Sequence, residues 1–396
     1  MKNKEKKVKV IVAMSGGVDS SVVAVLLKKQ GFDVVGIFMK FWNPSTSSGQ
    51  GGENRCCSTE SEKMARLVAN KIGIPFYVIN VEKEFKKRVV DYFLKEIKEG
   101  KTPNPCVVCN KEIKFGLLLE KALKMGAEYI ATGHYARLRR EIPNPKSEIR
   151  NKLQITNYKL QKAIDENKDQ SYFLWQLNQK QLSHTLFPIG EYTKPEVRKL
   201  AKKFKLPTAE TPESQEICFV SKDINDFLKK YLKSKPGPIC LLENRGTPDV
   251  PRKGDKKEIG KHEGLQFYTI GQRKGIKLSG GPYFVIAKDF KKNALIVSLG
   301  RSQTGEAKIP KDLLRKELIA KDVNWACPPK FCKAKFWRVK AKIRYRSKET
   351  SAKVFLLNEK KVKVIFSKPQ RAITPGQSVV FYLGKELLGG GIIDEN

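Results

Sequence analysis

Short apolar runs alternate with amphipathic segments along the N-terminal third of the chain. Residues 8–14 (VKVIVAM) are rich in β-branched side chains, and residues 21–30 repeat apolar positions at helical spacing up to Gly31, a typical helix-ending residue. The same alternation predicts strands at 34–39, 76–81 and 129–132 and helices at 58–72, 84–98 and 113–125. Strands that alternate with helices favour a parallel, doubly wound sheet. We therefore predict an α/β fold with a Rossmann-like first part.

The rest of the chain favours β-structure. Residues 153–163 (LQITNYKLQKA) alternate polar and apolar side chains and predict a hairpin, and PGP at 236–238 indicates a boundary. Short strands are predicted beyond it at 265–270, 283–287, 336–345, 351–357, 361–366 and 378–383. The last four are typical of a small β-barrel. We divide the chain into a catalytic domain (1–222), a central domain (223–305) and a C-terminal β-barrel (306–396).

The charge of the chain limits its partners. It holds 78 Lys+Arg and 41 Asp+Glu among 396 residues, a formal net charge of +37. Such an excess indicates a polyanionic partner, nucleic acid before others, although lysines that only solvate the surface would also produce it. Hydrophobic residues make up 40% of the chain, too many for a disordered basic tail, and no apolar run could span a bilayer. No signal-peptide pattern precedes the first strand, so we expect a cytoplasmic protein without a membrane partner.

A glycine- and serine-rich loop joins the first predicted strand to the first predicted helix. In residues 15–21 (SGGVDSS), two glycines allow a tight turn close to a ligand. The helix N-terminus behind them offers free N–H groups and the positive end of its dipole. Ser15, Ser20 and Ser21 add hydroxyl donors, and Asp19 is a candidate ligand for Mg²⁺. The loop lacks the terminal Gly-Lys-[Ser/Thr] of a Walker A loop, and an ordinary βα turn is the alternative interpretation.

Three of the eight cysteines suggest chemistry rather than a disulfide scaffold. Cys106 and Cys109 form a Cys-x-x-Cys pair, which we expect to place two thiols close together in a turn, and Cys218 follows on a distant segment. Such thiols suit a redox pair that delivers sulfur, an iron–sulfur cluster with one open iron, or part of a structural zinc site. Buried, inert cysteines are the fourth interpretation.

The loop sequence SGGxDS resembles that of the PP-loop ATP pyrophosphatases, which cleave ATP to AMP and pyrophosphate and adenylate a substrate oxygen. Over essentially its whole length the chain also resembles the tRNA-specific 2-thiouridylase family. The matching segments are AMSGGVDSSV, IFMK, TPNPxxxCNKEIKF, ATGHYAR, NKDQSYFL, SQEICFV, HEGLQFYTIGQRKG and PGQSVVFY. The resemblance implies an adenine nucleotide alpha hydrolase-like domain that binds ATP with Mg²⁺. It also implies that the C2 oxygen of the wobble uridine is replaced by sulfur through an adenylated uridine.

The resemblance implies site residues, position by position. Cys109 matches the nucleophile and Cys218 the cysteine that carries a persulfide, supplied by a sulfur-donor protein such as a persulfide carrier or a cysteine desulfurase system. Asn104, Pro105 and Cys106 match the segment that faces the target base. Positions that bind ATP are Ala13, Met14, Ser15, Gly16, Gly17, Val18, Asp19, Ser20, Met39 and Gly133. Positions that contact the tRNA anticodon stem-loop are His134, Lys168, Asp169, Gln170, Arg344, Tyr345 and Gln377.

Cys106 departs from the family pattern, because many relatives have an aspartate there. A carboxylate could act as a general acid or base, whereas a thiol with a reference pKa near ~8.5 suits that role poorly. The third thiol makes Cys106, Cys109 and Cys218 candidate ligands of a [4Fe–4S] cluster whose open iron binds sulfide. A cluster and a persulfide–disulfide relay both stay open here, and Cys56 and Cys57 have no assigned role.

Regularly spaced basic residues near the C-terminus support RNA binding. Arg338, Lys340, Lys342, Arg344 and Arg346 occupy every second position, which in a strand puts them on one face at intervals of about 6.6–6.8 Å. The loop GQRKG at 271–275 adds two cations, so we predict salt-dependent tRNA binding, with a solvated strand face as the alternative. Two other functions stay open: a PP-loop enzyme that adenylates a small molecule, and a non-catalytic RNA-binding protein. We expect a monomer.

Overall fold

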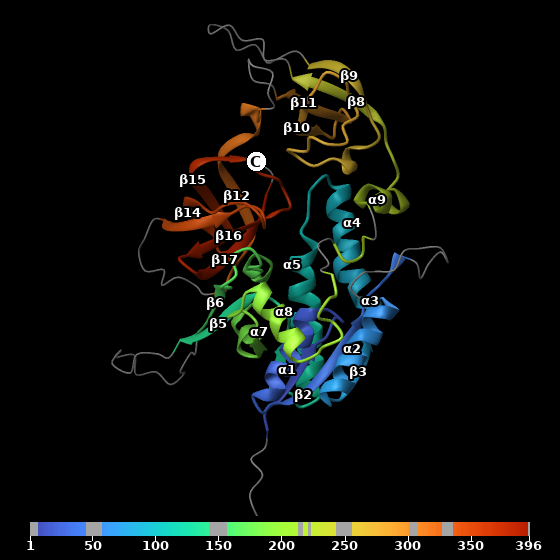
Figure 1. Cartoon of the computed structure of the whole chain (residues 1–396). Coiled ribbons are helices and arrows are strands. Elements are labelled where there is room, and N and C mark those ends of the chain that lie inside the picture. The colour runs from blue at the N-terminus through green and yellow to red at the C-terminus, as the bar shows by residue number, and fades with distance from the viewer. Residues whose placement is uncertain are drawn as a thin grey trace, which may run out of the picture.

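The structure is a computed structural model that describes residues 7–44, 58–141, 157–212, 217–220, 223–242, 256–300, 308–326 and 336–394. Figure 1 shows the first sheet and its helices at the bottom, a small sheet at the top and a barrel at the left, with α4 and α5 running up the middle. Cys56, Cys57, Cys327 and Cys332 lie outside the described residues.

The first sheet is parallel throughout, in the order β3-β2-β1-β4-β7. Its strands are β1 (Lys9–Ala13), β2 (Asp33–Lys40), β3 (Phe76–Asn80), β4 (Tyr129–Ala131) and β7 (Thr185–Leu186). Val10, Ile11 and Val12 of the central strand are fully buried. The predicted Rossmann-like sheet is confirmed. The strand order reverses between β1 and β4, and open α/β sheets bind ligands at such a point, at the carboxyl ends of their strands.

Helices cover both faces of this sheet. On one face α1 (Val18–Lys29), α2 (Thr59–Ile72) and α8 (Lys194–Lys203) pack against alternate residues of β1. The other face is covered by α3 (Glu82–Phe85), the π-helical segment η2 (Lys86–Val90), α4 (Asp91–Lys98), α5 (Pro105–Cys109), the π-helical segment η3 (Asn110–Leu117) and α6 (Leu118–Lys124). Of the helices within the described ranges, none has the length and apolar character that crossing a membrane requires.

Two helix starts differ from the prediction, and a third agrees with it. Helix α1 begins three residues early, at Val18, so half of the SGGVDS motif forms its first turn. Helix α2 begins where the prediction puts it, because the Ser58 side chain caps it by accepting a hydrogen bond from the Ser61 N–H at 3.1 Å. The helix predicted from 113 begins at Pro105, because proline at the first helical position is already set for helical φ.

A β-hairpin carries the chain from the first sheet to the barrel. It consists of β5 (Ala136–Glu141) and β6 (Asn157–Lys162), so residues 153–163 supply only one strand of the predicted hairpin. Gln161 of β6 pairs with Glu386 of the barrel. The chain then continues through η4 (Ser171–Leu174), α7 (Gln179–Ser183) and, after α8, α9 (Ile224–Tyr231).

The central sheet has the order β10-β11-β8-β9. Its strands are β8 (Gly237–Leu242), β9 (Lys256–His262), β10 (Tyr283–Asp289) and β11 (Ala294–Leu299). The strand predicted at 265–270 is wrong, because a 3₁₀ turn, η5 (Leu265–Phe267), buries the same apolar side chains. A short apolar run does not distinguish these outcomes by its periodicity.

The C-terminal strands close into the predicted barrel. After the turn η6 (Lys311–Leu313) they are β12 (Leu314–Trp325), β13 (Trp337–Lys342), β14 (Thr350–Asn358), β15 (Lys361–Arg371), β16 (Ser378–Leu383) and β17 (Glu386–Ile393). Their order is β12-β15-β14-β13-β16-β17, and pairing of β12 with β17 closes the circle. Each of these six strands therefore has a neighbour on both sides within the described residues. Strand β17 also pairs with β6 of the β5–β6 hairpin.

Candidate active site

The SGGVDSS loop lies at the carboxyl end of β1 and turns directly into α1. Gly16 has φ +75°, and a Cβ there would lie 2.2 Å from the Ser61 carbonyl oxygen, so only glycine fits. The Ser20 hydroxyl donates to the Gly17 carbonyl at 3.2 Å and accepts from the Ser15 N–H at 3.2 Å. These bonds hold the loop around the N-terminus of α1, a helix of 12 residues. The first N–H groups of such a helix have no partner within it and are suited to bind an anion.

The other predicted ATP-binding residues gather at the same edge of the sheet. Ala13 ends β1, and Met39 lies two residues beyond the position of β2 that pairs with Ala13. Gly133 follows β4, and a Cβ there would lie 3.0 Å from both the Ser20 nitrogen and the Asp19 Cβ. The structure therefore brings residues 13–20 together with Gly133, and this edge is where a nucleotide would bind in such a sheet.

The Asp19 carboxylate accepts hydrogen bonds from two other side chains. Both of its carboxylate oxygens accept hydrogen bonds from Lys194 Nζ, at 2.7 and 2.8 Å, and its Oδ1 also accepts from the Tyr135 hydroxyl at 2.8 Å. The Lys194 side chain is 8% exposed and the Asp19 side chain 30%. Sequence analysis missed Lys194; the Thr193–Glu196 capping box at the start of α8 signals a helix there but no ion pair.

The cysteines lie on a helix rather than in a turn. Asn104 precedes α5 as its N-cap residue and Pro105 begins it, so Cys106 and Cys109 are one helical turn apart. Cys106 is exposed, Cys109 is buried at 7% exposure, and Cys218 is half-buried beside the same hydrophobic cluster as Cys109. Nowhere in the described ranges do three His, Cys, Asp or Glu side chains meet as a metal-binding group.

All three parts of the molecule meet on the segment that leads into the cysteine helix. The barrel holds Thr102, whose N–H donates to the Pro375 carbonyl at 2.8 Å and whose carbonyl accepts from Gln377 Nε2 at 2.8 Å. The central sheet reaches the same segment through Lys288, whose Nζ donates to the Gly100 carbonyl at 3.0 Å. The position of α5 therefore depends on contacts from both other parts.

Two residues of the predicted tRNA-contacting set are buried in the first part. His134 is 8% exposed, and the Thr132 Oγ1 lies 2.8 Å from its Nδ1. Burial, and then the charge of Lys114, hold the pKa of His134 well below its usual value, so the imidazole is neutral. Asp169 is 5% exposed, and burial raises its pKa although three hydrogen bonds from Ala163 and Ser171 oppose the rise.

Other members of this set have contacts in the barrel, in the first part or between the two. The Tyr345 ring of the barrel lies 4.6 Å from the Phe173 ring, centroid to centroid, and Arg344 donates hydrogen bonds to the Arg371 and Ala372 carbonyls. The Gln170 side chain accepts a hydrogen bond from the Tyr135 N–H at 3.0 Å. Lys168 is half-buried. Of these residues, Tyr345 lies at the junction of the first part and the barrel, whereas the contacts of Arg344 lie within the barrel and that of Gln170 within the first part.

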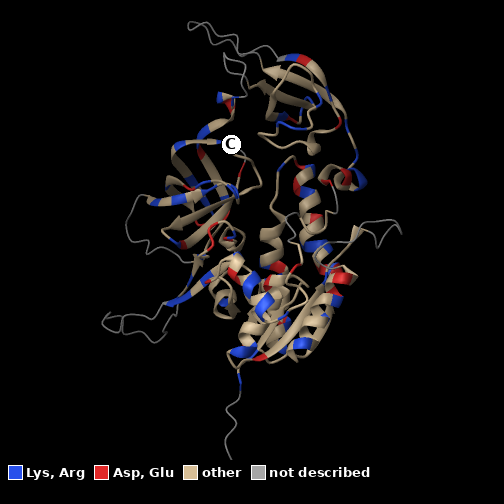
Figure 2. Ribbon diagram, viewed as in Figure 1, with Lys and Arg blue, Asp and Glu red and all other residues tan. Residues whose placement is uncertain are grey.

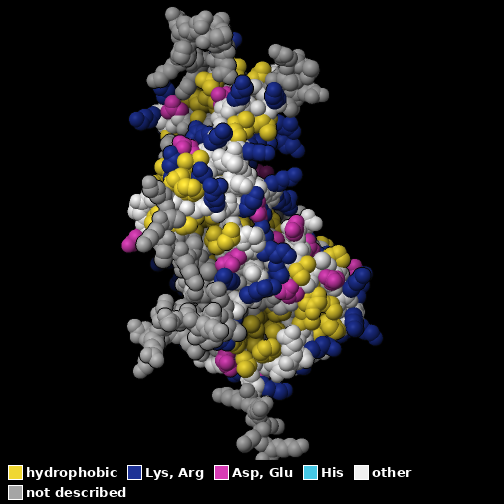
Figure 3. Space-filling view, turned by 90° about the vertical axis from the view of Figure 1, so that its left-hand side faces the viewer, with side chains coloured by type: hydrophobic (Ala, Val, Ile, Leu, Met, Phe, Trp, Pro, Cys, Tyr) yellow, Lys and Arg dark blue, Asp and Glu magenta, His cyan; other side chains and the backbone are white. Residues whose placement is uncertain are grey.

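The basic stripe is shorter than predicted. Strand β13 ends at Lys342, so Arg338 and Lys340 lie exposed on one face of it, whereas Arg344 and Arg346 belong to the following turn. Figure 2 shows further Lys and Arg on the barrel strands and on the β5–β6 hairpin, and Figure 3 shows them spread over the barrel side of the molecule. The cationic surface is therefore a broad field across these parts rather than one line.

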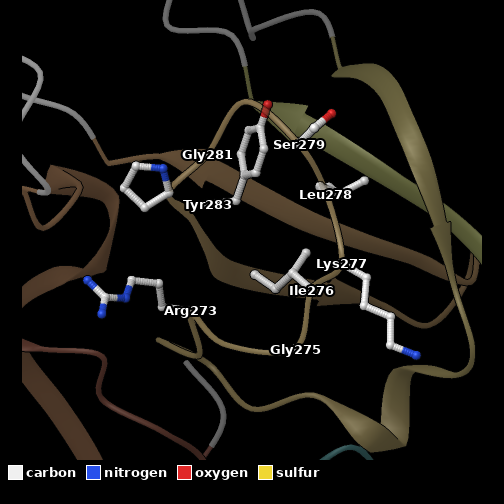
Figure 4. Close-up of a pocket in the computed structure, with 9 residues that line it drawn as sticks. Arg273, Gly275, Ile276, Lys277, Leu278, Ser279, Gly281 and Tyr283 are labelled. Atoms are coloured by element: carbon white, nitrogen blue, oxygen red, sulfur yellow. The ribbon is translucent and has the colours of Figure 1, made fainter.

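An open pocket of about 410 Å³ lies in the central part, in the loop between η5 and β10. Figure 4 shows that the Arg273 side chain points away from that of Lys277. Both side chains are exposed, and Lys277 pairs with Glu263 at 3.1 Å. The pocket is separate from the SGGVDSS loop and adds cationic surface beside the barrel.

Comparison with known proteins matches nearly the whole chain. Three family models cover it: the tRNA methyl transferase HUP domain at residues 8–222, the tRNA methyl transferase PRC-barrel domain at 225–299 and the aminomethyltransferase beta-barrel domain at 315–393. A tRNA-specific 2-thiouridylase MnmA of Bacillus cytotoxicus is 44% identical over 98% of this chain and 95% of its own. The chain belongs to the tRNA-specific 2-thiouridylase family.

A second member of the tRNA-specific 2-thiouridylase family, from Levilactobacillus brevis, is 45% identical over 98% of this chain and 95% of its own. Among solved structures, a predicted subunit of tRNA methyltransferase from Methanocaldococcus jannaschii is 20% identical over 57% of this chain and 87% of its own, with a TM-score of 0.28. That structural likeness is too slight to bear on function.

Proposed function

We propose that this protein is a tRNA sulfurtransferase that replaces the C2 oxygen of the wobble uridine by sulfur in an ATP-dependent reaction. The observation that carries the proposal is the match to tRNA-specific 2-thiouridylases along 98% of the chain. The SGGVDSS loop at the carboxyl edge of a parallel sheet supports the ATP-dependent step. A PP-loop enzyme with a small-molecule substrate is the alternative, and the cationic surface of the barrel and hairpin favours tRNA.

The first step makes the oxygen a leaving group. ATP lies over the N-terminus of α1, with its triphosphate against the loop around Gly16 and Ser20. The uridine O2 attacks the α-phosphorus, the bond from that phosphorus to the bridging oxygen breaks, and pyrophosphate departs with the electron pair. The uridine must leave its stack in the anticodon loop to reach the nucleotide.

The second step delivers sulfur. A sulfur-donor protein loads Cys218 as a persulfide, and the terminal sulfur of the persulfide attacks C2 of the adenylated base. The C2–O bond breaks and AMP departs with the oxygen. The Cys109 thiolate then attacks the Cys218 sulfur, which releases 2-thiouridine and leaves a Cys109–Cys218 disulfide. Two thiols of an external reductant restore both cysteines, so electrons and atoms balance.

The proposed reaction uses Mg²⁺ only as the ion bound to ATP. Asp19 is bonded to Lys194 through both carboxylate oxygens, so it offers Mg²⁺ no vacant oxygen pair, and Mg²⁺ would arrive as its complex with the triphosphate. Cys106 is exposed while Cys109 is buried, and neither forms part of a metal-binding group within the described residues. No step of the proposed reaction passes through a [4Fe–4S] cluster.

Mass spectrometry of tRNA nucleosides tests the proposal. Full-length protein is incubated with unmodified tRNA, ATP and a persulfide donor, and 2-thiouridine is measured beside AMP. We expect 2-thiouridine with the wild type and none with Cys109→Ser or Cys218→Ser, whereas Cys240→Ser, a matched change in the central sheet, retains activity. AMP formation that needs a small metabolite and yields no 2-thiouridine would favour the alternative.

A further inference from the structure

A buried lysine stands behind the nucleotide loop, and no part of the reaction described above uses it. Lys194 is the first residue of α8, and its side chain is 8% exposed. Its Nζ bonds both oxygens of Asp19, a residue in the first turn of α1. Burial of a charged lysine is costly without such a partner, so the fold maintains this contact between two helices 175 positions apart in sequence.

Several contacts fix the lysine in place. Its own backbone N–H donates to Asp165 Oδ2 at 2.9 Å, and its Nζ lies 5.7 Å from the centroid of the Tyr135 ring. The Tyr135 hydroxyl donates to Asp19 as well, at 2.8 Å. Asp19, Tyr135 and Lys194 therefore form one hydrogen-bonded cluster directly under the first turn of α1.

The position of this cluster sets up an electrostatic problem. A carboxylate in the first turn suits the dipole of α1, but beside an anion site it repels the phosphates of a nucleotide. An ammonium bonded to that carboxylate removes the repulsion and, with a small movement, can itself contact a phosphoryl oxygen. Charged donors aimed at a departing anionic group also stabilise the transition state in which it leaves.

We propose that Lys194 is the cation that contacts the β- and γ-phosphates of ATP, the part that departs as pyrophosphate, and that Asp19 is the positioning residue that holds it there. This inference rests on the proposed function. The bond that breaks joins the α-phosphorus to the bridging oxygen, and the Lys194 ammonium compensates the charge that this oxygen acquires.

Nucleotide binding measured by calorimetry tests the assignment without turnover. ATP, AMP and inorganic pyrophosphate are titrated in EDTA into the full-length wild type and into Lys194→Met. We expect Lys194→Met to weaken ATP and pyrophosphate binding by roughly ten- to a hundredfold, as for loss of a charged hydrogen bond, and to leave AMP binding within about twofold of the wild type. Lys199→Met is the matched control on the exposed side of α8 and should bind all three as the wild type does.

A double variant keeps the test decisive if the single variant folds poorly. Asp19→Asn with Lys194→Met removes both charges, so it leaves no unpaired carboxylate under α1. ATP affinity should rank wild type, then the double variant, then Lys194→Met. Equal losses for ATP and AMP would mean that the pair is only structural and would overturn the proposal. Unchanged ATP affinity in Lys194→Met would also overturn the proposal for Lys194. The proposed function would still stand in that case if the wild type thiolates tRNA. A wild type that bound no ATP would overturn both proposals.

Discussion

Lys288 gives a prediction whose size follows from its burial. This lysine of β10 is half-buried, with its Nζ 3.0 Å from the Gly100 carbonyl oxygen, and burial lowers its pKa from 10.5 to about 8. At pH 7 the folded protein must keep the ammonium charged in this site. Because one pKa unit corresponds to ~1.4 kcal/mol, the charge costs the folded state about 3 kcal/mol relative to the unfolded chain.

The sign of the pH dependence follows from proton counts. Above pH 8 the folded state releases the Lys288 proton while the unfolded chain still binds it, up to its pKa of 10.5. The free energy of unfolding therefore rises with pH by ~1.4 kcal/mol per pH unit over that window. In Lys288→Met this contribution is absent. The stability difference, variant minus wild type, should therefore fall by about 2 kcal/mol between pH 7.5 and pH 9.5.

Urea unfolding followed by tryptophan fluorescence at several pH values measures this difference. Comparing variant with wild type at each pH cancels the many other lysines and tyrosines that titrate in the same window. Lys291→Met, in the exposed turn after β10, is the control and should show no trend. A stability difference between Lys288→Met and wild type that stayed constant with pH would refute the reasoning.

Three further predictions concern the site and the tRNA surface. Gly16→Ala should abolish ATP binding in calorimetry, because the added Cβ would collide with the Ser61 carbonyl. Gly31→Ala is the control: Gly31 also has a positive φ but nothing lies within 4 Å of its added Cβ, so this change should only lower the melting temperature. Equal ATP binding by the two variants would contradict this prediction. Gln377→Leu removes the hydrogen bond to the Thr102 carbonyl and should lower the free energy of unfolding by about 1 kcal/mol. It should slow thiolation at saturating tRNA more than it weakens tRNA binding. A larger loss of tRNA binding than of thiolation rate would mean that Gln377 contacts tRNA directly. Replacing Arg338 and Lys340 by Gln should reduce the slope of log Kd against log salt by up to about 2 in filter binding, and an unchanged slope would place tRNA elsewhere.

The elements that follow from local sequence were predictable. Strand β1 and helix α1 carry their own periodicity, whereas the helix that begins at Pro105 and holds the Cys-x-x-Cys pair was expected to be a turn. Barrel strands β13, β14 and β15 alternate clearly, because each has one face in the core and one in solvent. Local sequence patterns are therefore enough to predict the fold class and the position of the nucleotide loop.

Long-range contacts were not predictable in this way. The bond from Lys194 to Asp19 joins residues that no sequence pattern connects, and it removes Asp19 from the role of an open Mg²⁺ ligand. Gln377 reaches Thr102 across 275 positions, and the side chain of a barrel residue therefore acts on the cysteine helix. The basic stripe was overestimated because a turn after Lys342 interrupts the strand without any glycine or proline to signal it.

An isotope experiment tests the central claim most directly. A tRNA that carries ¹⁸O at C2 of its wobble uridine is incubated with full-length protein, ATP and a persulfide donor, and the products are analysed by mass spectrometry. The proposed reaction transfers the C2 oxygen to AMP, so AMP should carry one ¹⁸O atom and pyrophosphate none, in step with 2-thiouridine. Unlabelled AMP formed together with 2-thiouridine would contradict the claim that the uridine oxygen is the group activated by ATP.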